Sequence, residues 1–72
     1  MISTGGLAMI DFAKKIKEYR KRKFLTQEEF AKIIGVSVLS VNRWENGKFE
    51  PTMQLKKKLY QLFIEAGMKV EE

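Results

Sequence analysis

The chain has 72 residues, which is enough for one small domain with a single core. It contains neither cysteine nor histidine, so disulfide bonds are excluded, the usual ligands of zinc are missing, and we expect no metal and no cofactor. The 14 Lys and Arg against 9 Asp and Glu give a net charge of +5, which favours nucleic acid or an anionic membrane surface as partner.

A basic run is also the ordinary solvated face of a helix, so charge alone does not decide the function. No apolar run approaches the roughly 18–20 residues of a membrane span, and the first ten residues lack the features of a signal peptide. We therefore expect a cytoplasmic protein that does not enter the membrane.

The distribution of apolar residues predicts an all-helical chain. No segment shows the alternation of a strand, and Pro51 is the single proline. We expect a flexible N-terminal segment at residues 1–9, one compact helical domain at residues 10–67 and a frayed C-terminus at residues 68–72.

The first helix is expected at about residues 11–22. Phe12, Ile16 and Tyr19 recur at i, i+4 and i+7, which places them on one apolar stripe. Seven of the 14 basic residues fall within residues 14–23, and most of them would lie on the solvent side of this helix.

The second helix has the clearest start signal. Thr26 followed by Glu29 fits a capping box, in which each side chain binds the backbone N–H of the other residue. Leu25 before the cap and Phe30 inside the helix fit the accompanying hydrophobic contact. Gly35 is expected to end the helix, because glycine tolerates a positive φ.

A third helix is expected shortly after this glycine. Ser37 can cap it, and it would run to about Asn46, with Gly47 as its end. A helix, a short turn with glycine and a second short helix form a helix-turn-helix.

At about 100° per residue, the third helix has two different sides. The inward side collects Ser37, Val41, Trp44 and Glu45. The outward side collects Leu39, Asn42, Arg43 and Asn46, with Val38 and Ser40 on the flanks. We expect Trp44 in the core, and the outward side mixes hydrogen-bonding and aliphatic groups, as reading of base edges in a major groove requires.

A fourth helix is expected at about residues 53–66, with two apolar sides. Its main stripe would face the core, and its far side consists of Met53, Tyr60 and Ile64. A helix that is apolar on two sides usually covers something on both. We expect a second subunit on the far side, which would make a homodimer. The alternative is that the far side is covered by one of the N-terminal residues Ile2, Leu7 or Ile10.

Two stretches of the sequence, LTQEEFAKIIGVS (25–37) and VNRWENGKFEPT (41–52), resemble the XRE family of phage-repressor-like helix-turn-helix proteins. The resemblance covers about residues 11–62. It implies an all-α, lambda-repressor-like domain of four or five helices, whose third helix lies in the major groove of double-stranded DNA.

The resemblance also implies roles for individual residues. The base-contacting positions would be Ser37, Val38, Leu39, Asn42 and Arg43. The positions near DNA phosphates would be Gln27, Ser40, Asn46 and Lys48. Arg20 and Glu45 match a buried ion pair that ties the first helix to the third.

Two departures from the family pattern matter. Many members have glycine between the first two helices, where this chain has Phe24, so either the turn differs or Phe24 is an extra core residue. Many members also continue into a fifth helix that often carries the dimer contacts. This sequence predicts no such helix, which leaves the oligomeric state open.

These observations favour a sequence-specific DNA-binding transcriptional regulator, acting as a repressor. The alternative is an antitoxin or co-regulator whose main contact is a toxin or another partner protein, which would not need Asn42 and Arg43 on the outward side. We expect no enzyme, because the carboxylates are explained by capping and ion pairing and no nucleophile–base pair is visible.

Overall fold

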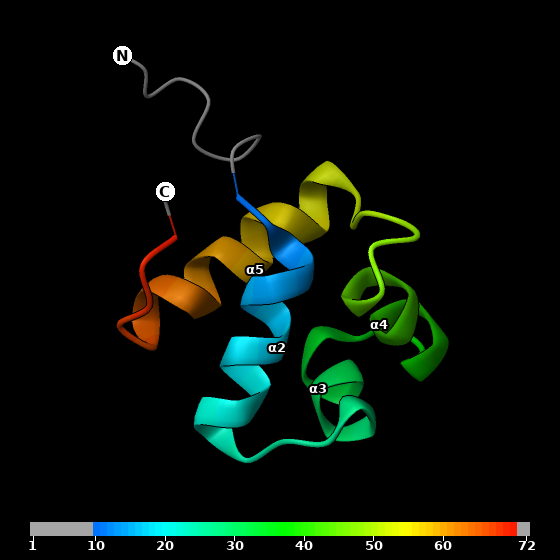
Figure 1. The fold of residues 1–72 in the computed structure, drawn as a ribbon, viewed down its shortest axis with the longest axis horizontal. Helices are drawn as coiled ribbons and strands as arrows, with labels where there is room; N and C mark the ends of the chain where they lie inside the picture. The colour runs from blue at the N-terminus through cyan, green and yellow to red at the C-terminus, as the bar shows by residue number, and fades with distance from the viewer. Residues whose placement is uncertain (1–9, 71–72) are drawn as a thin grey trace.

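The computed structural model describes residues 10–70, and within them the chain is helical and contains no strand. The helices are α2 (Phe12–Lys23), α3 (Gln27–Ile34), α4 (Val38–Glu45) and α5 (Met53–Glu65). Figure 1 shows α2 between α5 on one side and the α3–α4 pair on the other. The predicted all-α class is confirmed. No helix between residues 10 and 70 is long and apolar enough to cross a membrane.

Each helix begins at a polar side chain that caps its first turn. The predicted capping box is present, because the Thr26 hydroxyl accepts from Glu29 N–H at 3.0 Å and the Glu29 carboxylate accepts from Thr26 N–H at 2.8 Å. Ser37 caps α4 by accepting from the backbone N–H of Ser40 at 3.1 Å. Asp11 and Thr52 cap α2 and α5 in the same way.

A residue with positive φ follows each described helix. These residues are Phe24, Gly35, Gly47 and Gly67. The non-glycine residue among them, Phe24, has a φ of 56°, a conformation that costs an L-residue about 1–2 kcal/mol. Its side chain is 92% exposed, so the expectation that Phe24 could be an extra core residue is wrong. The turn keeps the left-handed conformation that glycine adopts easily, and here a phenylalanine adopts it.

Aromatic rings join the helices in the core. The ring of Tyr19 in α2 lies 5.7 Å from that of Phe30 in α3 and 6.1 Å from that of Phe63 in α5. Phe30 and Phe63 are fully buried, and Trp44 is buried as expected. This cluster joins α2, α3 and α5, and α4 packs against α2 and α3.

The end of the described chain differs from expectation. Residues 68–72 were expected to be frayed, but Met68 and Val70 are buried in the core. The backbone N–H of Met68 donates to the carbonyl of Phe63 at 3.0 Å, which turns the chain back after α5. Apolar side chains at alternate positions then reach the core without a helix. Residues 71–72 and the N-terminal segment 1–9 lie outside the described residues.

Candidate nucleic-acid interface

The turn between α3 and α4 sets the direction of α4. Gly35 has a φ of 90°, and its N–H and that of Val36 both donate to the carbonyl of Ala31, at 2.7 and 3.0 Å. These bonds end α3, and Ser37 begins α4 two residues later. The chain therefore changes direction within three residues.

Burial divides α4 into two sides. Val41, Trp44 and Glu45 are buried against the rest of the domain. The candidate base-contacting residues Ser37, Val38, Leu39, Asn42 and Arg43 are all exposed, including Ser37, which was expected on the inward side. Of the candidate phosphate-contacting residues, Asn46 and Lys48 are exposed and Ser40 is half-buried.

A largely buried ion pair joins α2 to α4. Arg20 Nε donates to Glu45 Oε2 at 2.6 Å and Arg20 Nη2 donates to Glu45 Oε1 at 2.9 Å. A third donor of Arg20, Nη1, reaches the carbonyl of Leu25 at 3.0 Å in the turn before α3. The Glu45 side chain is only 4% exposed and that of Arg20 is 21% exposed. The pair therefore anchors α4 from its buried side.

Two opposing effects act on the Glu45 carboxyl. Burial raises its pKa, because the charged form loses hydration. Hydrogen bonds from Arg20 and Gln27, together with the positive charges of Arg20 and Lys17, outweigh this effect and hold the pKa of Glu45 below its ordinary value. The hydrogen bond to Glu45 also raises the pKa of Arg20.

Amide side chains extend this ion pair to the exposed side of α4. Gln27 Nε2 donates to Glu45 Oε1 at 3.1 Å, and Gln27 Oε1 accepts from Asn42 Nδ2 at 3.4 Å. Asn42 Oδ1 in turn accepts from Asn46 Nδ2 at 3.1 Å. A continuous chain of hydrogen bonds thus runs from the interior to the exposed side chains.

These bonds leave Asn42 with unused capacity. A carboxamide has two N–H donors and two acceptor lone pairs, and Asn42 uses one of each among residues 10–70. The remaining donor and acceptor match adenine in a major groove, where N7 accepts and the N6 amino group donates.

Arg43 is next to Asn42 and lies against an aromatic ring. Its guanidinium carbon is 5.1 Å from the centre of the Phe49 ring. Among residues 10–70, its side chain makes no hydrogen bond or ion pair, so all its N–H donors are available. Phe49 had no predicted role, although its place two positions after the helix-ending glycine Gly47 is a signal in the sequence.

Comparisons with known proteins agree with this arrangement. A family model described as Helix-turn-helix matches residues 16–63, which is more than half of the chain. The chain belongs to the XRE family of helix-turn-helix proteins. The resemblance read from the sequence is therefore confirmed.

Relatives of this XRE-family chain include named regulators. An uncharacterized HTH-type transcriptional regulator of Methanocaldococcus jannaschii is 40% identical over 58 residues, which cover 81% of this chain and 83% of the relative. The HTH-type transcriptional activator BcrR of Enterococcus faecalis is 35% identical over 54 residues, which cover 75% of this chain and 26% of BcrR. Antitoxin PezA of Streptococcus pneumoniae is 48% identical over 42 residues, which cover 58% of this chain and 27% of PezA. No solved structure gave a significant match.

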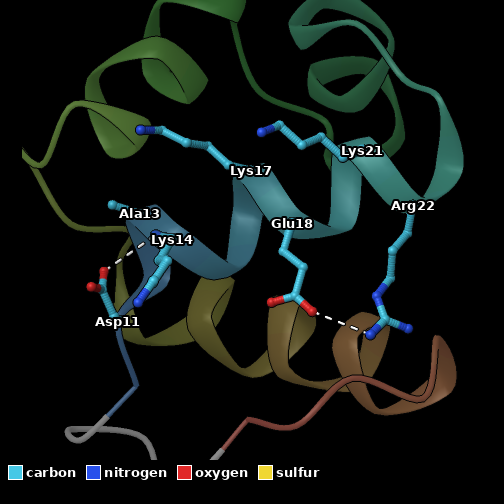
Figure 2. A pocket seen from close by; sticks show the side chains of 7 residues that line it. All are labelled: Asp11, Ala13, Lys14, Lys17, Glu18, Lys21 and Arg22. Carbon is cyan, nitrogen blue, oxygen red and sulfur yellow. Dashed lines mark hydrogen bonds and ion pairs between the residues drawn. The ribbon is translucent and has the colours of Figure 1, made fainter.

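The XRE-family chain also carries basic side chains beside α4. Figure 2 shows Lys17 and Lys21 extending on the same side of α2. Glu18 instead forms an ion pair with Arg22, with 3.3 Å between the carboxylate and the guanidinium. Lys17 lies one helical turn before Arg20, whose bond to Glu45 joins α2 to α4, so this basic side of α2 is near α4. The basic run of the sequence is therefore partly paired and partly available to an anion.

The far side of α5 is only partly covered. Met53 and Ile64 are exposed, and they lie on the same side of the helix because eleven residues make about three turns. Tyr60, between them, is half-buried and packs against the core. Ile10 is buried in the core, while Ile2 and Leu7 lie outside the described residues.

Proposed function

We propose that this protein is a sequence-specific, double-stranded DNA-binding transcriptional regulator that reads the major groove with α4. The observation that carries the proposal is the pair Asn42 and Arg43, adjacent on the exposed side of α4 with unused donors. A major groove admits an α-helix, and these two side chains suit adenine and guanine.

The neighbouring residues complete this interface. Val38 and Leu39 are exposed apolar groups that suit contact with thymine methyl groups. Ser37 lies at the edge of the base-contacting set. Ser40, Asn46 and Lys48 are proposed to bind phosphates, which position a protein on DNA without reading its sequence.

Gln27 has a different role in this proposal from that of a simple phosphate ligand. Its side chain is engaged between Glu45 and Asn42, which supports a role in orienting Asn42. Its backbone N–H lies in the first turn of α3, where helix N–H groups favour an anion. We assign the phosphate contact of Gln27 to this N–H.

Of the two directions of regulation, we propose repression. A protein that occupies a major groove excludes other proteins from the same DNA, whereas activation requires a further contact with the transcription machinery. The similarity to the activator BcrR makes the direction worth measuring. A promoter–reporter fusion that carries the bound site should lose expression when this protein is supplied.

We also propose that a second copy of the chain binds the far side of α5, which makes a homodimer. The exposure of Met53 (57%) and Ile64 (47%) supports this assignment, because residues 10–70 leave about half of each residue uncovered. A two-fold dimer would present two copies of α4 to two half-sites of DNA.

Selection from a random pool of DNA duplexes tests the main proposal. The unmodified protein should enrich one sequence motif. Lys57→Ala, which removes one positive charge from the exposed surface of α5, should enrich the same motif. Asn42→Ala combined with Arg43→Ala should enrich none, although it should still fold. Failure of the folded, unmodified protein to enrich any motif would reject the proposal.

A second candidate function is that of an antitoxin or co-regulator whose main contact is a partner protein. The similarity to Antitoxin PezA favours it, although that similarity covers a minor part of PezA. The same selection separates the two candidates, because a module that binds only a protein enriches no DNA motif.

A further inference from the structure

We propose that Phe49 is a positioning residue that orients the Arg43 guanidinium for base recognition. This inference rests on the proposed DNA-binding function. It begins from the distance of 5.1 Å between the guanidinium carbon and the ring centre. Phe49 lies outside α4, in the segment that leads to α5, so its position needs a structural cause.

The end of α4 supplies this cause. Gly47 has a φ of 73°, and its N–H donates to the carbonyl of Trp44 at 3.1 Å. The N–H of Lys48 donates to the carbonyl of Arg43 at 3.0 Å. These two bonds form a Schellman motif, which reverses the chain at the end of a helix. The reversal brings Phe49 back beside the residue six positions earlier.

The contact suits recognition of guanine. An aromatic ring takes the flat side of a guanidinium and leaves the N–H donors at its edge unobstructed. Guanine requires two parallel donors, one for O6 and one for N7. An arginine side chain without a neighbour loses much rotamer freedom when it binds a base through two N–H donors. A side chain that already packs against a ring has fewer rotamers to lose, so its binding costs less entropy.

The exposure of Phe49 is consistent with this role. The residue is 56% exposed, and it also lines a hollow together with Phe12, Trp44 and Pro51. The ring therefore contributes only part of its surface to the fold and offers another part to Arg43. A substitution that keeps an apolar side chain but removes the ring should preserve the packing of residue 49 in the fold and remove its contact with Arg43.

The experiment compares Phe49→Leu, which keeps apolar bulk without a ring, with Phe49→Tyr, which keeps the ring. Both variants are also made in an Arg43→Ala background, and their melting temperatures are measured. Binding is measured on the duplex that the unmodified protein selects and on its single-base-pair variants. Phe49→Leu should reduce preference about threefold to fivefold at the base pair that is sensitive to Arg43→Ala. Phe49→Tyr should keep that preference. In the Arg43→Ala background, neither change at position 49 should alter the preference that remains at this base pair.

Two results would overturn the inference while leaving the proposed function in place. One is that Phe49→Leu weakens binding to every duplex by the same factor, which would make Phe49 a general DNA contact. The other is a preference that Phe49→Leu leaves unchanged at every base pair. If the unmodified protein prefers no duplex at all, the proposed function itself fails, and the inference fails with it.

Discussion

Arg20 and Glu45 lie 25 positions apart in the chain, and two hydrogen bonds of 2.6 and 2.9 Å fasten them together. Lys56 and Glu50 have the same shortest separation of 2.6 Å, but the Glu50 side chain is 76% exposed. The two pairs therefore have similar distances and differ in their access to water. The more exposed Lys56–Glu50 pair is therefore a control for the effect of burial on the Arg20–Glu45 pair.

The first prediction compares the same chemical change in both pairs. Glu45→Gln should lower the free energy of unfolding by about 3 kcal/mol, because it leaves the Arg20 charge without its partner. Glu50→Gln should lower it by less than about 1 kcal/mol, as expected for an exposed pair. Urea denaturation at neutral pH measures both values. Equal, small changes would contradict a stabilising role for the buried pair.

The second prediction concerns acid. The pKa of Glu45 is lower in the folded protein than its ordinary value of 4.5, so the unfolded chain binds the proton more readily. The contribution of Glu45 is complete above that ordinary value and decreases as the pH falls towards the folded pKa. The stability of Glu45→Gln should therefore fall less steeply below about pH 5 than that of Glu50→Gln. Parallel curves for the two variants would refute the assignment.

The third prediction concerns the strained turn after α2. Phe24→Gly should raise the free energy of unfolding by about 1 kcal/mol, because glycine adopts a φ of 56° without the steric cost. Phe24→Ala removes the same exposed ring but keeps a Cβ atom, so it should change stability little. Thermal and urea unfolding distinguish the two variants. The same effect from both would mean that the backbone conformation is not the cause.

The fourth prediction separates base reading from phosphate binding. Arg43→Ala should cost about 1–3 kcal/mol on the selected duplex and relax the preference at one base pair. Lys48→Ala should weaken binding to all duplexes alike and reduce the salt slope by about one unit. Titrations on the selected duplex and a scrambled duplex, over a series of salt concentrations, measure both effects. If Arg43→Ala keeps the full preference between the duplexes, Arg43 binds the DNA backbone instead.

The fifth prediction tests the proposed homodimer. Met53→Glu combined with Ile64→Glu should convert a dimer to a monomer at micromolar protein concentration, because charges would enter an apolar interface. Gln54→Glu combined with Gln61→Glu adds the same charges to neighbouring exposed positions of α5 and should leave the dimer intact. Sedimentation velocity measures all three proteins. A monomeric unmodified protein would remove the basis of the proposal.

The helices were predictable because their signals are local. The capping box of Thr26 and Glu29 and the glycine at position 35 lie within the segments that they delimit. The contact of Arg43 with Phe49 was not predictable in this way, because it depends on how the chain reverses after Gly47.

Features that depend on the assembled fold were also missed. The burial of Met68 and Val70 depends on where the core lies when the chain leaves α5. The bond between Gln27 and Asn42 depends on how α4 packs against α3. Local periodicity contains no information about either arrangement.

The hydrogen-bond chain from Glu45 to Asn42 has a consequence for how the protein can diverge. Any replacement at position 42 that alters base preference also removes a partner of the Gln27 amide, which itself helps to hold the Glu45 carboxylate. New DNA preferences at this position should therefore arise together with compensating changes at position 27. Among residues 10–70, no side-chain hydrogen bond ties Arg43 to the interior, so position 43 can vary alone or together with position 49. Among duplicated copies of this protein, the first substitutions that change DNA preference should therefore occur at position 43.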